Sequence, residues 1–117
     1  MTAVVIEQWV DVCPVTKLQP ERGVAALVGD EQVAIFLVGD DMFAVSNYDP
    51  FSQANVMSRG IVGTRGDVVK VASPMYKQQF DLRSGECLDD PTKGLEVFPV
   101  RVVSGVVEVA CSVRDTR

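Results

Sequence analysis

Short runs of apolar residues, separated by glycine-containing turns, are the main pattern along this chain. Two such runs, at residues 23–29 and 31–39, meet at Gly29-Asp30, a dipeptide that is typical of a tight β-hairpin. A third run, at 41–47, follows a second turn signal at Gly39-Asp40. The pattern therefore predicts two successive antiparallel hairpins.

The strand expected over residues 31–39 differs from a half-exposed strand because both of its faces are apolar. Successive side chains of a strand point to opposite sides of the sheet, so a strand with one solvent-exposed face alternates polar and apolar residues. This run does not alternate, and we predict that it is covered on both sides. One face carries Val33, Ile35 and Leu37, and the other carries Ala34, Phe36 and Val38.

The second half of the chain continues the same pattern. Residues 67–73 and 78–82 predict two further short strands. The segment 96–103 also has strand character, but Pro99 within it cannot donate a backbone hydrogen bond. This strand is therefore expected at a sheet edge or locally bulged. A last strand is expected at 106–111.

Helical periodicity is weak, with one turn at most expected around Val15 to Leu18. Short strands with glycine turns at regular spacing are typical of β-sandwiches and barrels. We predict an all-β fold: an antiparallel β-sandwich of short strands with little helix, in a single domain over residues 1–117 with its core at about 8–112. The longest irregular stretch, 47–60, is of a length that is usually functional or packed by its own side chains.

Composition and charge narrow the functional classes. The net charge is −5 and no basic patch with interleaved aromatic residues occurs, which argues against nucleic-acid binding. Histidine is absent, so the commonest general base and zinc ligand are missing. The three cysteines are widely spaced, and we interpret them as reduced, buried thiols. No apolar run has the length of a signal peptide or a membrane span, so a cytoplasmic location is expected.

Residues 73–85 resemble the second ligand segment of Rieske-type iron–sulfur domains. In that family, Cys-Pro-x-His is followed by three intervening residues, then by Phe-Asp-Leu, and then by a glycine turn. Here Ser73-Pro74-Met75-Tyr76 precedes Phe80-Asp81-Leu82 and Gly85 at the matching spacing. The resemblance implies that Ser73 stands at the cysteine position and Tyr76 at the histidine position.

The first ligand segment matches less closely. Asn47 and Asp49 stand where Cys-x-His is expected, and the separation from Asp49 to Ser73 is longer than the usual Rieske spacing. Cluster irons are held by thiolate and imidazole groups, which none of the four degenerate positions supplies. We therefore expect no iron–sulfur cluster, no other cofactor, no metal and no catalytic residue in this chain.

Four segments are similar to the small-subunit family of bacterial assimilatory NAD(P)H-dependent nitrite reductases, a Rieske-like family without cluster ligands. The similarity implies a Rieske-like fold over nearly the whole chain. It also implies a non-catalytic subunit of the cytosolic oxidoreductase that reduces nitrite to ammonium in nitrate assimilation. The implied partner is the large subunit, and FAD, an iron–sulfur cluster and sirohaem are implied in that partner. The segments are 29–36, 46–51, 58–60 and 72–80.

The degenerate ligand loops are expected to form a rigid protein-binding tip. We expect Asn47 and Asp49 to accept hydrogen bonds from nearby backbone amides. Ser73 and Tyr76 are expected to hydrogen-bond across to the other loop. Such hydrogen bonds would hold the two loops in place, as the metal cluster does in Rieske-type domains that carry it.

Four residues are candidates for contact with the partner, and each has a structural alternative. Phe51 is either an exposed anchor or a residue that pins its own loop. Arg59 pairs either with a partner carboxylate or internally with Asp49. Tyr76 and Lys77 either contact the partner, or Tyr76 fills the former cluster cavity and Lys77 is simply solvated.

Two other functions stay open from the sequence. A free-standing β-domain that binds another oxidoreductase or a small ligand predicts an apolar pocket or an unrelated partner. A Rieske-type electron carrier is disfavoured by the loss of the ligands. No nucleic-acid or membrane partner is expected in any of these cases.

Overall fold

The computed structural model describes residues 3–116, and the side chains of residues 8–111. Strands make up the regular structure of this range, with two short 3-10 helices, so the all-β expectation is confirmed. The helices are η1 (Val15–Lys17) and η2 (Met57–Arg59). The strands are β1 (Ala3–Pro14), β2 (Val24–Val28), β3 (Glu31–Val38), β4 (Asp41–Ser46), β5 (Tyr48–Asp49), β6 (Ala54–Asn55), β7 (Ile61–Arg65), β8 (Val68–Ala72), β9 (Gln79–Asp81), β10 (Val97–Phe98), β11 (Val100–Val103) and β12 (Val106–Thr116).

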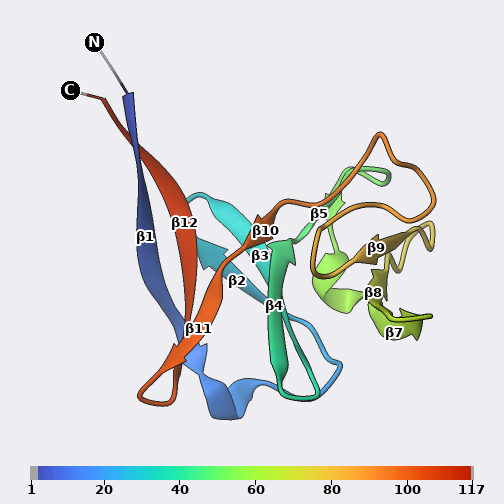
Figure 1. The fold of residues 1–117 in the computed structure, drawn as a ribbon, viewed down its shortest axis with the longest axis horizontal. Helices are drawn as coiled ribbons and strands as arrows, with labels where there is room; N and C mark the ends of the chain where they lie inside the picture. Colours follow the sequence, from blue (N-terminus) through green and yellow to red (C-terminus); the bar gives the residue numbers. More distant parts are fainter. Residues whose placement is uncertain (1–2, 117) are drawn as a thin grey trace.

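The described strands form antiparallel sheets arranged as a sandwich with an additional lobe (Figure 1). The terminal sheet has the order β1-β12-β11, and the central sheet has the order β10-β4-β3-β2. The lobe consists of the tip sheet, β7-β8-β9, and the small hairpin β5–β6. In Figure 1 the lobe lies on the right, on the other side of the central sheet from β1 and β12.

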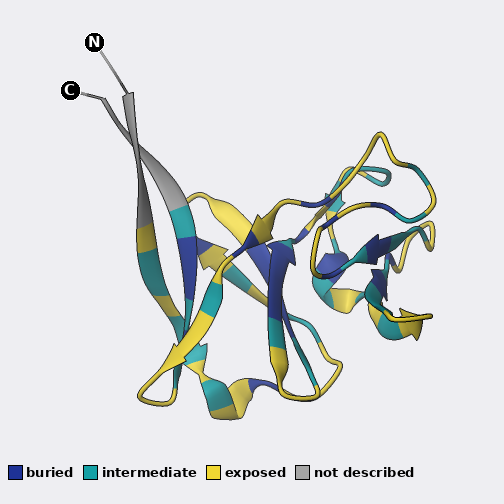
Figure 2. Cartoon of the chain, in the orientation of Figure 1, coloured by how far each residue is buried: buried dark blue, intermediate teal, exposed yellow. Residues whose placement is uncertain are grey.

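The middle of β3 in the central sheet is buried on both faces, as its apolar run predicted. Val33 and Ile35 pack with residues of the terminal sheet such as Val107. Ala34 and Phe36 pack on the opposite face, with residues of the lobe. Figure 2 shows the resulting concentration of buried residues along β3 and β4. The alternation of a strand thus divides the interior into two cores, one on each side of a single sheet.

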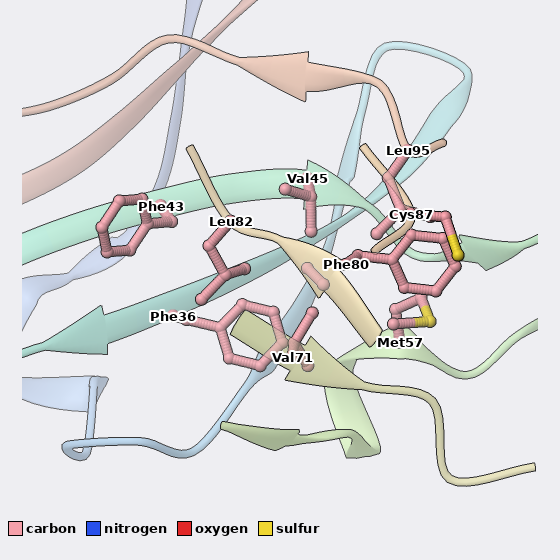
Figure 3. Packing of buried hydrophobic residues seen from close by; sticks show 10 residues of the cluster. Phe36, Phe43, Val45, Met57, Val71, Phe80, Leu82, Cys87 and Leu95 are labelled. Atoms are coloured by element: carbon pink, nitrogen blue, oxygen red, sulfur yellow. The ribbon is translucent and has the colours of Figure 1, made fainter. Parts of the chain in front are cut away.

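The core beneath the lobe connects the sandwich to the tip loops (Figure 3). Phe36 from β3 and Phe80 from β9 are its largest fully buried side chains. Burying a phenylalanine contributes roughly 1.5–3 kcal/mol relative to leaving it exposed, so these contacts fix the lobe against the sheet. The other side chains drawn in Figure 3 include Phe43, Val45, Met57, Val71, Leu82, Cys87 and Leu95.

Both predicted hairpins form at the expected turns. Val28 pairs with Glu31 across Gly29-Asp30, and the next hairpin closes in the same way across Gly39-Asp40. Gly29 and Gly39 have φ values of 62° and 60°. This left-handed region is open to glycine at no steric cost, which explains glycine at the first position of each turn.

Two expectations about the strands need correction in part. The edge position expected for the segment 96–103 is confirmed, but the segment is not one strand: it is divided at Pro99, where the chain leaves the edge of the central sheet (β10) and joins the edge of the terminal sheet (β11). Proline cannot take part as a donor in a ladder, so it suits the point of transfer. The stretch 47–60 is also more regular than expected, because it contains the β5–β6 hairpin and η2.

Candidate functional site

The two degenerate ligand segments lie in loops that meet at the lobe. The first loop, residues 47–60, leaves the central sheet after β4. The second loop, residues 73–78, joins β8 to β9 in the tip sheet. A buried hydrogen bond of 2.6 Å joins them, donated by Ser73 Oγ to Asp49 Oδ2 across a sequence separation of 24 residues. The bond between the two loops that the sequence predicted for Ser73 is therefore present.

Asp49 is the centre of this contact, with a side chain that is fully buried. Besides the Ser73 hydroxyl, its carboxylate accepts hydrogen bonds from the Ser52 hydroxyl at 2.8 Å and from the Phe51 amide at 2.9 Å. Burial alone would raise the pKa of the Asp49 carboxyl, but these hydrogen bonds outweigh burial and lower the pKa below its usual value. The group is therefore a buried carboxylate held in its charged form by its donors.

Asn47 ties the first loop to the rest of the fold. Its side-chain oxygen accepts a hydrogen bond from the Ser58 amide at 2.7 Å, and its side-chain nitrogen donates to Gln32 Oε1 at 3.2 Å. Its backbone amide donates to the Gln32 carbonyl, and its carbonyl accepts from the Met57 amide. The side chain is 2% exposed. Asn47, Asp49 and Ser73 together are called the polar clasp below.

The second loop is closed by its own backbone. The Ser73 amide donates to the Gln78 carbonyl, and the Lys77 amide donates to the Ser73 carbonyl. The Ser73 hydroxyl also accepts from the Met75 amide at 3.2 Å. Lys77 has a φ of 65°, a left-handed conformation that is costly for residues other than glycine. The loop thus holds a defined shape that exposes residues 74–77.

Tyr76 does not take the place expected from a cluster ligand. Its side chain is 61% exposed, so the alternative in which it fills a former cluster cavity is wrong, and it takes no part in the hydrogen bonds of the clasp. The reason is that the Asp49 carboxylate and the Ser73 hydroxyl meet directly and leave no space for a ring between them. Met75 beside it is 54% exposed, and Lys77 is exposed as well.

Phe51 and Arg59 have different surroundings. Phe51 is half-buried, its ring centroid lies 6.1 Å from that of Phe80, and the Lys93 ammonium lies 5.6 Å from its centroid. Phe51 therefore pins its own loop. Arg59 is exposed, and no ion pair within the described part of the chain includes it. Its expected pairing with Asp49 is wrong, because hydroxyl and amide donors already occupy that carboxylate.

Ile61 is an exposed residue at this end of the molecule that the sequence did not indicate. It opens β7, is 72% exposed, and pairs in register with Ala72, the residue before Ser73. The strand β7 was not predicted, because Gly63 and charged neighbours interrupt its apolar pattern. An isolated isoleucine after a glycine was the only available signal.

The donor atoms at the degenerate positions do not fit a [2Fe-2S] cluster, which needs thiolate and imidazole ligands. Asn47, Asp49, Ser73 and Tyr76 supply oxygen or amide groups, and the clasp already uses three of them. The cysteines lie elsewhere: Cys87 is buried in the core beneath the lobe, and Cys13 and Cys111 pack against the other core. Among the described residues, no three His, Cys, Asp or Glu side chains gather into a metal site.

None of the described residues forms a helix long and apolar enough to cross a bilayer.

Comparison with known proteins gives consistent matches over most of the chain. The sequence profile of the Rieske-like [2Fe-2S] domain family matches residues 8–110. The nitrite reductase (NADH) small subunit of Escherichia coli (strain K12) is 43% identical over 106 residues, covering 89% of this chain and 98% of the relative. The crystal structure of a Mycobacterium tuberculosis protein assigned as an NADH-dependent nitrite reductase small subunit superposes with a TM-score of 0.87. It is 49% identical and covers 91% of this chain and 96% of its own.

One further relative places a similar domain inside a longer protein. The nitrite reductase [NAD(P)H] large subunit of Klebsiella oxytoca is 38% identical over 101 residues, which cover 86% of this chain but 11% of the relative.

Proposed function

This chain belongs to the Rieske-like [2Fe-2S] domain family and, within it, to the nitrite reductase small subunits, and we propose that it acts as the small, non-catalytic subunit of a cytoplasmic NAD(P)H-dependent nitrite reductase. The observation that carries the proposal is the 43% identity to such a subunit over 98% of that subunit's length. We further propose that residues 1–117 form one Rieske-like domain.

The relative from Klebsiella oxytoca supports a partner of the large-subunit type. In that protein a domain similar to this chain is part of the same polypeptide as a large subunit. Covalent linkage keeps a domain at high effective concentration beside its neighbour, so a separate chain of the same kind is suited to bind that neighbour directly. The proposed partner is accordingly the cofactor-bearing large subunit, in which FAD, an iron–sulfur cluster and sirohaem would reside.

The exposed end of the tip loops is the proposed contact surface. Tyr76 and Met75 are large, exposed side chains on a loop whose base is fixed by the buried clasp. Tyrosine is enriched at the energetic centres of interfaces, and pre-ordered loops lose less conformational freedom on binding. Lys77 directly follows these side chains, and Arg59 precedes Gly60, which packs against Ala72 at the start of the same loop. These two charged residues would contribute a basic rim.

The role of the chain in catalysis would be structural or conformational. Its ligand positions do not fit a cluster, so electrons would pass through groups of the large subunit. Docking of the tip would order that subunit or shape access to its active site. This role predicts that the small subunit changes the activity of the large subunit without contributing a redox centre.

Co-purification tests the proposal. The chain and its large subunit are expressed together, and association, iron content, acid-labile sulfide and NAD(P)H-dependent nitrite reduction are measured for the complex and for each subunit. We expect association at micromolar concentration, a change in activity on association, and no iron in the isolated chain. An isolated chain with stoichiometric iron and sulfide would refute the non-catalytic role, and failure to associate would refute the subunit assignment.

A further inference from the structure

An uncovered part of the central sheet forms a second surface with the features of a binding groove. In register, Ala25 of β2 pairs with Ala34 of β3, and Leu27 pairs with Gln32, so these residues share one face of the sheet. On this face Ala34 is fully buried by the lobe, whereas Leu27 is 69% exposed. The lobe therefore covers the middle of the sheet and leaves the apolar side chains of its edge strand open.

The open face is hollowed into a groove. A hollow of about 300 Å³ lies between the β2–β3 hairpin, which contributes Leu27 and Gln32, and the β5–β6 hairpin, which contributes Tyr48 and Asn55. A second hollow of about 290 Å³ is lined by Ala25 and shares Leu27 and Gln32 with the first. The two hollows therefore adjoin each other at the β2–β3 hairpin, where Leu27 and Gln32 line both of them.

The walls of the groove are fixed by the polar clasp. Gln32 accepts the side-chain hydrogen bond of Asn47, and the Tyr48 amide donates to Ser46 Oγ at 3.2 Å. Tyr48 itself lies between two buried members of the clasp, Asn47 and Asp49, yet its own side chain is 44% exposed. The groove therefore adjoins the tip loops and shares their ordered base.

The described residues give the groove a negative charge. Asp30 and Glu31 line it, and none of the lining residues within 8–111, the range of described side chains, is basic. Glu96 lies close by, because its carbonyl accepts a hydrogen bond from the amide of the groove residue Ser46. Burial, and then the neighbouring Glu31 carboxylate, raise the pKa of Glu96, which is consistent with a region of negative potential.

We propose that this groove binds an extended segment of the large subunit that carries an arginine or a lysine. The aliphatic stem of such a side chain would lie along Leu27 and the ring of Tyr48, with its cationic head at the carboxylates of Asp30 and Glu31. An apolar wall beside two carboxylates matches this amphipathic chemistry better than it matches an anion or a purely apolar ligand. The proposal rests on the proposed function. It adds an acidic contact at the groove to the basic rim at the tip loops, and these two contacts of opposite charge would fix the orientation of the chain on the large subunit.

A charge-matched pair of variants tests the groove. Asp30→Asn with Glu31→Gln removes two carboxylates from it. The control, Asp40→Asn with Asp67→Asn, removes two exposed carboxylates at other turns, and Asp40 follows Gly39 as Asp30 follows Gly29. Binding of each full-length chain to the large-subunit holoenzyme is measured by calorimetric titration at low and high salt. Thermal unfolding establishes that each variant is folded.

We expect the groove variant to bind about tenfold more weakly than wild type at low salt, with a smaller difference at high salt because exposed charges are screened. The control is expected to remain within about twofold of wild type at both salt concentrations. Leu27→Ala, which shortens the apolar wall, should weaken binding about equally at low and high salt.

The possible failures are distinguishable. Equal affinities of the groove variant, the control and wild type would overturn the groove while leaving the proposed function intact. An equal loss in the groove variant and the control would show a general effect of net charge and would also overturn it. A wild-type chain that does not bind the large subunit at all would overturn the proposed function, and the groove with it.

Discussion

The two halves of the degenerate ligand loops have opposite environments. The inner half consists of Asn47, Asp49 and Ser73, which are buried and hydrogen-bonded to one another or to the fold. The outer half is residues 74–77, which are exposed and whose side chains lie outside the bonds of the clasp. Three of the four degenerate positions have thus become internal structure, and the fourth, Tyr76, has become surface.

This contrast shows how a metal-binding frame can persist without metal. A cluster holds two loops together by bonds to both of them, and a buried carboxylate with three donors can do the same with hydrogen bonds. Once the base of the loops is fixed in this way, their ends are free to carry side chains that serve a different contact. Stability and docking are therefore expected to separate between the two halves.

The largest effect is expected at Asp49. Asp49→Ala leaves the Phe51 amide and the Ser52 and Ser73 hydroxyls without their acceptor, at roughly 1–3 kcal/mol for each buried unsatisfied group. We expect the free energy of unfolding to fall by about 3 kcal/mol, with some of the cost relieved by water entry. Urea unfolding measures the change.

The control for this variant is Asp67→Ala at the exposed turn between β7 and β8, which should change stability by less than about 0.5 kcal/mol. Equal effects at Asp49 and Asp67 would mean that the clasp does not organise the inner half.

A somewhat smaller effect, on binding rather than on stability, is expected at Tyr76. Tyr76→Ala should weaken binding to the large subunit about 30-fold, or about 2 kcal/mol, if the ring is at the centre of the contact. Its free energy of unfolding should stay within about 0.5 kcal/mol of wild type, since the side chain is exposed.

Val102→Ala is the matched control for Tyr76→Ala, because Val102 is an exposed apolar residue of the terminal sheet. A loss of stability without a loss of affinity at Tyr76 would place this residue with the inner half and remove it from the contact surface.

Low pH should destabilise the inner half of the loops by protonating the Asp49 carboxylate. The pKa of this carboxyl is lowered in the folded state, so the stability it contributes is present above its unfolded pKa of about 3.9. That contribution is lost as the pH falls through the folded pKa. The difference in free energy of unfolding between wild type and Asp49→Asn should therefore be constant near neutral pH and should narrow in acid below about pH 4. A difference that is the same at pH 3 and pH 7 would show that the charge of Asp49 is not what stabilises the clasp.

The smallest effect is expected at Lys77, whose φ of 65° is strained for a residue with a Cβ atom. Lys77→Gly should raise the free energy of unfolding by less than about 1 kcal/mol, while lost charge weakens binding to the large subunit. Glu21→Gly relieves the same kind of strain at a φ of 63° outside the tip loops and should leave binding unchanged. Equal binding of the two variants would indicate that Lys77 is only solvated.

The sequence was sufficient for much of the sandwich because its signals there are local. Gly29-Asp30 and Gly39-Asp40 mark their turns, and the apolar run in β3 indicates a strand covered on both faces. The division of the strand at Pro99 could not be predicted, because the transfer of a chain between sheets depends on the sandwich as a whole.

At the candidate site, too, the sequence predicted contacts between complementary groups but not those that depend on how distant segments pack. The bond from Ser73 to Asp49 was expected because hydroxyl and carboxylate groups at converging loops are complementary. Of the two placements left open by the sequence for Arg59 and for Tyr76, the pairing of Arg59 with Asp49 and the burial of Tyr76 are wrong, since both depended on space that the clasp itself occupies. The exposure of Ile61 and the open groove beside Tyr48 arise from packing between distant segments and have no local signature.

Hydrogen exchange of the chain, free and in complex with the large-subunit holoenzyme, tests the central claim most directly. The claim is that the outer half of the former ligand loops contacts the partner while the inner half is already ordered. We expect the amides of residues 75–77 to gain protection in the complex, and those around Asn47 and Asp49 to be protected in both states. Unchanged exchange at 75–77 in a formed complex, with protection gained only on the terminal sheet, would contradict the account.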